Sequence, residues 1–194
     1  MEKHIIKKLD SEQVKSLYYE RMKYDFPSNE IKPLSSIERG ISEDRYDCIG
    51  LFEGNDILGY AYFAILKQNN ITAHMLDYFA IEKSRRNTGL GSEFFRLLSV
   101  YLKDSSIAFL ETENPEYAKN DTERQIQIAR QNFYKKNNCA DTGITACVSG
   151  AEYNIYKITS SRDFDKDEIR RLYLEVYRRL VSPKFFKTEV LIHD

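Results

Sequence analysis

The spacing of apolar residues predicts a mixture of strands and helices along the chain. Apolar runs at residues 46–52, 57–66 and 71–81 are separated by the turn-forming stretches Gly54-Asn55-Asp56 and Gln68-Asn69-Asn70. Runs of this length between such turns are typical of an antiparallel meander. Ile5-Ile6, ahead of them, indicates a short first strand.

Helical spacing of apolar residues recurs in four other stretches. Asp10 or Ser11 is the expected N-terminal cap of the first helix, and a polar stretch after it, at 27–45, reads as a loop with a short helical piece. In the third helix we expect Ile126, Ala129 and Phe133 to face inward. The predicted helices lie near residues 11–22, 90–101, 122–137 and 165–180.

Three short apolar segments fall between the later helices. Residues 107–110 form a continuous apolar run flanked by predicted helices, as in a parallel strand pair. Residues 144–148 and 153–158 read as a hairpin around Ser149-Gly150. The element order β-α-β-β-β-α-β-α-β-β-α predicts an α+β (mixed α/β) fold in a single domain, residues 1–194.

Composition and charge narrow the function classes. The 29 Lys+Arg and 30 Asp+Glu give a net charge of −1, which argues against a nucleic-acid partner. No apolar run reaches the length of a membrane span, and the first residues lack the apolar stretch of a signal peptide. The three cysteines form no C-x-x-C pair, and the three histidines lack metal-ligand spacing. We therefore expect a cytoplasmic protein with reduced thiols, no metal and no membrane partner.

One stretch suggests specific chemistry. A predicted strand ends at Ile81, and a link containing Arg85 and Arg86 leads through Gly89 and Gly91 into a helix. Backbone N–H groups at such a turn, together with the helix N-terminus, favour a phosphate or pyrophosphate. The alternative reading of Gly-x-Gly is an ordinary tight turn. The stretch is neither a Walker A loop nor a dinucleotide fingerprint, since no Gly-Lys-Ser/Thr follows and the third glycine is replaced by a phenylalanine.

The wider pattern resembles the GNAT superfamily of acetyl-CoA-dependent N-acetyltransferases. Phe79-Ala80-Ile81 is followed five positions later by Arg86, with Gly89 and Gly91 in register with that family's Arg/Gln-x-x-Gly-x-Gly/Ala motif. Residues 133–139, Phe-Tyr-Lys-Lys-Asn-Asn-Cys, resemble the later Phe/Leu-Tyr-x-x-x-Gly-Phe motif. Two departures are Asn87, where glycine is common, and Asn138-Cys139 in place of Gly-Phe. Asparagine tolerates the left-handed backbone conformation, so these turns need not be broken.

The resemblance implies a GNAT-like fold over residues 4–158, with a central, mostly antiparallel mixed sheet flanked by helices. A C-terminal helical extension, at about 163–182, would be an addition. The resemblance also implies that acetyl-CoA is the cosubstrate, with its pantetheine arm along the strand end and near Asn114. The residues expected to bind it are Phe79, Ala80, Ile81, Arg86, Asn87, Thr88, Gly89, Leu90, Gly91, Ser92 and Asn114.

The same resemblance implies the catalytic groups. Tyr134 matches the usual general acid, which would protonate the departing thiolate. Candidates for the base are Glu111, Asp77 and Glu113, which we expect near strand ends, where each has the alternative role of a solvated carboxylate. Strand alternation predicts that Asp77 shares a face with Phe79, and Glu111 with Glu113.

We therefore expect an N-acetyltransferase that acts on a primary amine by direct attack. The alternative is an inactive GNAT-fold module that binds acyl-CoA as a sensor. The sequence leaves the acceptor amine unidentified. Acidic residues within 22–45 would suit a cationic one. The alternative, which the interspersed Lys32, Arg39 and Arg45 favour, is a solvated loop of mixed charge. Tyr173 and Tyr177 widen the apolar surface of the last helix, which covers either the core or a second subunit in a homodimer.

Overall fold

The computed structural model describes residues 4–193, and its strands match the predicted runs closely. The meander and the later hairpin are confirmed, and Ser149 and Gly150 at the hairpin turn both have positive φ, at 51° and 78°. The strands are β1 Ile5–Lys8, β2 Tyr46–Glu53, β3 Asp56–Gln68, β4 Ile71–Ile81, β5 Ile107–Glu113, β6 Ala140–Val148, β7 Ala151–Ser160 and β8 Val190–Ile192.

The strands form a mixed sheet in the order β1-β2-β3-β4-β5-β7-β6-β8. The β4–β5 pair is parallel, with Ala73–Leu76 beside Ile107–Leu110, as the buried run predicted. The pairs β1–β2, β2–β3, β5–β7, β6–β7 and β6–β8 are antiparallel. The predicted α+β class with a mostly antiparallel sheet is therefore confirmed.

The helices begin where the sequence provides caps. The side chains of Asp10 and Asp165 accept hydrogen bonds from backbone N–H groups in the first turns of α1 and α6, and each forms a capping box. A π-helical turn, Tyr18–Met22, joins α1 to α2. The α-helices are α1 Ser11–Leu17, α2 Lys23–Asp25, α3 Leu34–Ser42, α4 Leu90–Tyr101, α5 Asp121–Lys136, α6 Lys166–Leu180 and α7 Pro183–Glu189.

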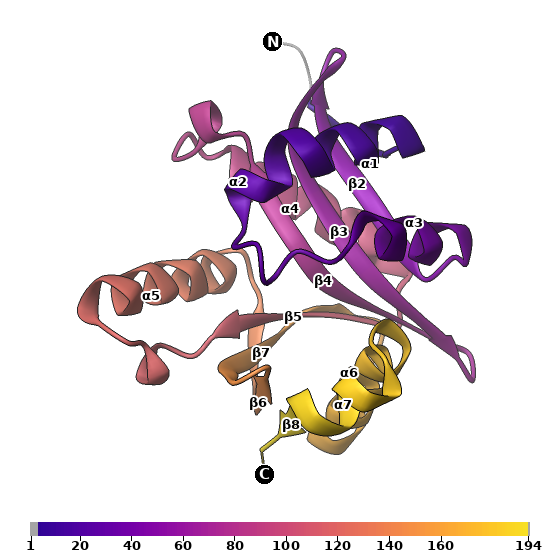
Figure 1. Cartoon of the computed structure of the whole chain (residues 1–194), viewed down its shortest axis with the longest axis vertical. Coiled ribbons are helices and arrows are strands. Elements are labelled where there is room, and N and C mark those ends of the chain that lie inside the picture. The colour runs from indigo at the N-terminus through magenta and orange to yellow at the C-terminus, as the bar shows by residue number, and fades with distance from the viewer. Residues whose placement is uncertain (1–3, 194) are drawn as a thin grey trace. The chain divides into compact units, whose positions relative to one another are not determined.

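The chain divides into two compact units, which share strands β3 and β4. Of the described residues, 4–65 and 77–98 form the first unit, and 66–76 and 99–193 form the second. In the first unit, α1 and α3 lie on one side of β2–β4 and α4 lies on the other (Figure 1). In the second unit, α6 and α7 lie beside β8 (Figure 1). The single-domain prediction for residues 1–194 stays a prediction.

Two expectations about the second unit were wrong or incomplete. Helix α5 turns Gln127, Gln131 and Tyr134 inward, whereas Ile126 is 55% exposed and Ala129 is exposed. The apolar residues of this helix therefore do not mark its buried face. The C-terminal extension also continues past the predicted helix into α7 and β8, which are too short to show a clear periodic pattern.

Candidate functional site

The link between β4 and α4 is an exposed turn with two left-handed residues. A 3₁₀ turn at Lys83–Arg85 leads through Asn87, with φ of 63°, and Gly89, with φ of 90°, into α4 at Leu90. Asparagine adopts this conformation more readily than most residues, so Asn87 keeps the turn where the family commonly has glycine. Asn138, the other departure, has φ of 65°. The backbone geometry that glycine usually supplies is therefore present at both positions.

Most backbone N–H groups of this turn are not used inside the described part of the protein. Within residues 4–193, the N–H groups of residues 87–91 have no protein acceptor, while those of Ser92 and Glu93 bond to the Gly89 carbonyl at 3.1 Å. Residues 87–89 are exposed. The N-terminus of α4 adds positive potential at the same place, so the turn can bind an anion through its backbone.

The two arginines of the turn are bound to carboxylates of the first unit. Arg86 donates through Nε to the Ile81 carbonyl at 3.0 Å and through a terminal nitrogen to Asp25 at 2.5 Å. Arg85 donates to Glu53 at 3.1 Å. The sequence predicted only added positive charge here, but the arginines also fasten the turn to the strand end and to α2.

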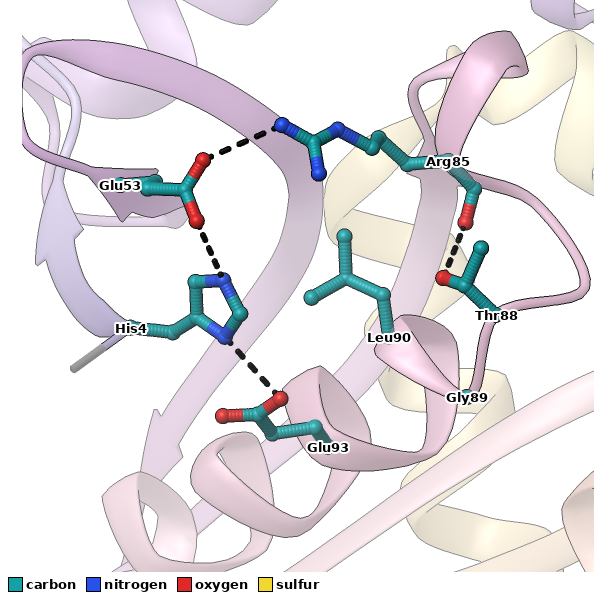
Figure 2. A pocket seen from close by; sticks show the side chains of 7 residues that line it. All are labelled: His4, Glu53, Arg85, Thr88, Gly89, Leu90 and Glu93. Atoms are coloured by element: carbon teal, nitrogen blue, oxygen red, sulfur yellow. Dashed lines mark hydrogen bonds and ion pairs between the residues drawn. The ribbon is translucent and has the colours of Figure 1, made fainter. Parts of the chain in front are cut away.

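An open pocket of ≈ 330 Å³ borders the turn (Figure 2). His4 bridges Glu93, 3.0 Å from Nδ1, and Glu53, 3.3 Å from Nε2, and Figure 2 shows both contacts. The hydrogen bond that the His4 ring donates to Glu93, followed by the negative charge of Glu93 and the hydrogen bond to Glu53, raises the pKa of His4 above its usual value. These contacts could not be predicted from the sequence, since Glu53 and Glu93 lie far from His4 along the chain.

The strand end that leads into the turn is largely buried. Ala80 and Ile81 are 7% and 8% exposed, and the Phe79 ring stacks on Phe94 at 5.4 Å and meets Phe95 edge-on at 5.8 Å. Both partners lie on α4. Phe79 therefore anchors the strand to the helix that carries the turn.

Asp77 has different neighbours from Phe79, and the expectation that the two side chains share a face of β4 stays a prediction. The Lys32 ammonium lies 2.7 Å from each carboxylate oxygen of Asp77, and the Tyr46 hydroxyl donates to the same carboxylate. Burial, followed by the charge of Asp77, raises the pKa of Tyr46 well above its usual value, so the phenol stays protonated. Asp77 is thus a paired carboxylate rather than a solvated one.

The candidate carboxylates of the second unit also face different partners. The hydroxyls of Tyr173 and Tyr177, on α6, donate to the two oxygens of Glu111 at 2.7 Å each. Glu113 instead pairs with Arg130 of α5, and its carbonyl accepts a hydrogen bond from Gln131 at 3.3 Å. The register of β5 on β7 is regular from Glu111 to Glu113, which agrees with the prediction that the two side chains share a face of the strand, although their partners differ.

Tyr134 and Asn114 lie in the second unit. Tyr134 is 8% exposed, and burial raises its pKa to about 12. Its ring contacts that of Phe133 at 5.2 Å. The Asn114 side chain accepts a hydrogen bond from the Glu116 backbone at 3.1 Å and so caps the 3₁₀ turn Pro115–Tyr117.

The predicted site residues therefore fall into two sets. The first unit brings together the 86–92 turn, the strand end at 79–81 and Asp77. The second unit holds Glu111, Glu113, Asn114 and Tyr134. Among the described residues, no His, Cys, Asp and Glu side chains gather as a metal site would require. Within residues 4–193, no helix has both the length and the apolar character that crossing a membrane needs.

We compared the chain with family models, with curated protein sequences and with solved structures, and only solved structures are similar to it. No family model and no curated protein sequence matches the chain. Among solved structures, it is similar to a protein from Bacteroides thetaiotaomicron assigned to the GNAT acetyltransferases, with a TM-score of 0.64 and 15% identity over 94% of this chain and 98% of that one.

Two further structures have named acceptors. The ribosomal-protein-S18-alanine N-acetyltransferase from Escherichia coli aligns with a TM-score of 0.58 and 15% identity, over 83% of this chain and 97% of that one. The aminoglycoside 6′-N-acetyltransferase from Enterococcus faecium aligns with a TM-score of 0.57 and 15% identity, over 82% and 99%. The chain has the GNAT fold, and the resemblance found in the sequence is confirmed at the level of the fold.

Proposed function

We propose that this protein transfers an acetyl group from acetyl-CoA to a primary amine. The observation that carries the proposal is the 86–92 turn at the N-terminus of α4, where residues 86–89 are exposed and the N–H groups of residues 87–91 have no acceptor within residues 4–193. Such a turn suits the pyrophosphate of acetyl-CoA, because backbone donors and the helix dipole act on the same anion. The similarity to solved acetyltransferases with the same fold supports this reading.

The strand end would hold the rest of the cosubstrate. Residues 79–81 lie beyond the stretch of β4 that pairs with β5, which ends at Leu76. We propose that the pantetheine arm bonds to the backbone of residues 79–81, while Asn114, in the second unit, stays a candidate that the family resemblance implies. A backbone N–H at the strand end would then polarise the thioester carbonyl and stabilise the oxyanion that develops there.

The reaction joins the amine nitrogen to the acetyl carbon and breaks the carbon–sulfur bond. We propose Tyr134 as the group that faces the departing sulfur. With a pKa of about 12 it is protonated at neutral pH, so it can donate a hydrogen bond to the thiolate. Full proton transfer would be uphill, because a thiol of pKa about 8.5 is the stronger acid.

A base is needed because the attacking amine must be neutral. Glu111, Asp77 and Glu113 remain the candidates. Each already has a protein partner: two tyrosines for Glu111, Lys32 and Tyr46 for Asp77, and Arg130 for Glu113. The base would therefore act through water or after its partner moves.

A measurement of acetyl-CoA binding tests whether the 86–92 turn holds the pyrophosphate. In a calorimetric titration we expect saturable binding of acetyl-CoA and CoA, and none of ATP. Gly89→Val should weaken acetyl-CoA binding at least tenfold, because a β-branched residue at this positive φ is strained. Gly150→Val is the matched control, since Gly150 has a φ of 78° and equally open space at a distant hairpin. Equal affinities for the two variants would contradict the assignment of the turn.

Turnover distinguishes an enzyme from the alternative, a module that binds acyl-CoA without reaction. With a panel of amines, we expect acceptor-dependent release of CoA. Tyr134→Phe should lower kcat by about 100-fold if it serves the leaving group. Tyr156→Phe is the control, because Tyr156 is also buried, with a pKa of about 12, but lies on β7. Binding without turnover for every amine would favour the sensor.

A further inference from the structure

In the first unit, the ammonium group of Lys32 lies in a cluster of one carboxylate and two phenols, which we call the cage: Asp77, Tyr46 and Tyr78. Lys32 Nζ lies 2.7 Å from both carboxylate oxygens of Asp77 and 5.4 Å from the centre of the Tyr78 ring. The Tyr46 hydroxyl donates to the same carboxylate. A carboxylate beside an aromatic face is the chemistry that binds a primary ammonium, through charged hydrogen bonds and a cation–π contact.

The cage is sheltered from water. The Asp77 and Lys32 side chains are 12% and 28% exposed, and Tyr46 and Tyr78 are 4% and 3% exposed. An ion pair in such surroundings is screened less than one on the surface. The cage therefore selects for a cation with hydrogen-bond donors and an apolar stem.

Lys32 enters the cage from a segment with no regular structure. Between α2 and α3, the Lys32 backbone donates to the Tyr78 hydroxyl at 2.9 Å, and that hydroxyl donates to the Glu30 carbonyl at 2.8 Å. Residues 27–30 are exposed. The lysine side chain can therefore leave the cage without breaking a helix or a strand.

The cage lies beside the elements assigned to acetyl-CoA. Asp77 precedes Phe79 by two residues, which is about 7 Å along a strand. The same segment begins after Asp25, which accepts hydrogen bonds from Arg86 of the turn at 2.5 Å and from Tyr60 at 2.8 Å. One short stretch of chain thus contacts both the turn and the cage.

The aromatic cluster around the cage has an unused donor. Tyr62 is fully buried, with its ring centre 6.1 Å from those of Tyr46 and Tyr78. Its hydroxyl has no hydrogen-bond partner within residues 4–193. A buried polar group normally has one, so this cluster has spare capacity for a further polar group.

We propose that Asp77, Tyr46 and Tyr78 form the subsite for the acceptor's ammonium, and that Lys32 occupies it until an acceptor displaces it. This inference rests on the proposed acetyl transfer and narrows its acceptor to an aliphatic primary amine resembling a lysine side chain. The bound ammonium loses one proton to solvent, the neutral nitrogen bonds to the acetyl carbon, and the thiolate leaves and takes up a proton as CoA thiol. The net products are the acetylated amine, CoA and one proton.

The test empties the cage and supplies an amine of the same shape. n-Butylamine reproduces the four-carbon stem and ammonium of lysine. At saturating acetyl-CoA, Lys32→Ala should raise kcat/KM for n-butylamine at least tenfold over the original protein. Lys8→Ala is the matched control, because Lys8 forms a similar 2.6 Å ion pair with Asp47 in the same unit, and it should leave kcat/KM unchanged. Adding Asp77→Asn to Lys32→Ala should remove the gain.

Further variants and a binding measurement distinguish failure of the subsite from failure of the proposed acetyl transfer. Lys32→Met retains most of the stem without the charge, and it should show the same direction of change if Lys32→Ala folds poorly. Acetyl-CoA affinity is measured for each variant. Normal acetyl-CoA binding with an unchanged or lower kcat/KM for n-butylamine in both variants would overturn the subsite. Absence of acetyl-CoA binding by the original protein would instead overturn the proposed function, and the subsite with it.

Discussion

The surroundings of Asp77 and Glu111 show how two similar strand carboxylates acquire different roles. Asp77 is paired with a cation, Lys32, from an irregular segment, and with one phenol. Glu111 is held by two phenols that both come from α6. A paired cation can be exchanged for a ligand cation, whereas two hydroxyls on one helix fix that helix to its strand. The difference therefore lies in the partners and not in the carboxylates.

The partners of Glu111 suit a fixed connection. Tyr173 and Tyr177 are four residues apart and lie on one face of α6. Burial, followed by the charge of Glu111, raises the pKa of Tyr173 well above its usual value, so its hydroxyl remains a donor at neutral pH. Helix α6 thus contributes to the stability of the folded state through a polar contact as well as through its apolar face.

The largest expected effect is the loss of the Glu111 carboxylate. Glu111→Ala would leave two buried hydroxyls without their acceptor, at a cost of about 3 kcal/mol in the free energy of unfolding. Urea denaturation measures this change. A loss below about 1 kcal/mol would contradict the fixed connection, and the variant Glu111→Gln, which retains an acceptor, should lose less.

Removing the charge of Asp77 should cost less. Asp77→Asn leaves the Lys32 ammonium without its counter-charge, but that side chain is 28% exposed and can turn toward water. We expect a loss of about 1–2 kcal/mol. Asp47→Asn is the control, since its partner Lys8 is 63% exposed, and it should lose less than about 1 kcal/mol. The two carboxylates are similarly buried, so equal losses by denaturation would mean that the exposure of the partner lysine does not set the cost.

A single hydroxyl on α6 should matter less again. Tyr177→Phe removes one donor from Glu111 while Tyr173 remains, and we expect a loss of about 1 kcal/mol. The double variant with Tyr173→Phe measures their coupling by denaturation. Strictly additive losses would show that the two hydroxyls act independently on the carboxylate.

The smallest effect is the pH dependence from His4, near the surface of the first unit. Its pKa in the folded state is raised by Glu93 and Glu53, so its contribution to stability is complete below about pH 6.5, the unfolded value. It is lost as the pH rises through the folded pKa. His4→Gln should therefore cost more stability at pH 6 than at pH 8.5, measured by urea midpoints. A cost that does not change with pH would contradict the pairing.

Local patterns predicted most of the fold. The strands and the helix caps could be predicted from the sequence, because alternation, turns and caps depend on residues that are neighbours along the chain. Helix α5 failed because its inner face carries Gln127, Gln131 and Tyr134, and apolar periodicity cannot identify a buried glutamine. Short elements such as α7 give too few residues for any period to appear.

The candidate site divides in the same way. The 86–92 turn is a backbone feature, and its glycines and asparagine were visible in the sequence. The partners of Asp77 and Glu111 were not, since Lys32 lies 45 residues from Asp77 and Tyr177 lies 66 residues from Glu111. Nothing in either local sequence distinguishes a carboxylate paired with a cation from one that holds a helix.

The short strand β8 has a consequence for self-association. Val190–Ile192 pair with residues 146–148 of β6, which would otherwise be the outer strand of the sheet at that end. An uncovered strand offers a row of backbone donors and acceptors to any other extended chain. By placing Val190–Ile192 along β6, the protein shields that row and leaves a strand of only 3 residues at the edge, so removing residues 190–193 would expose β6 to pairing with other chains.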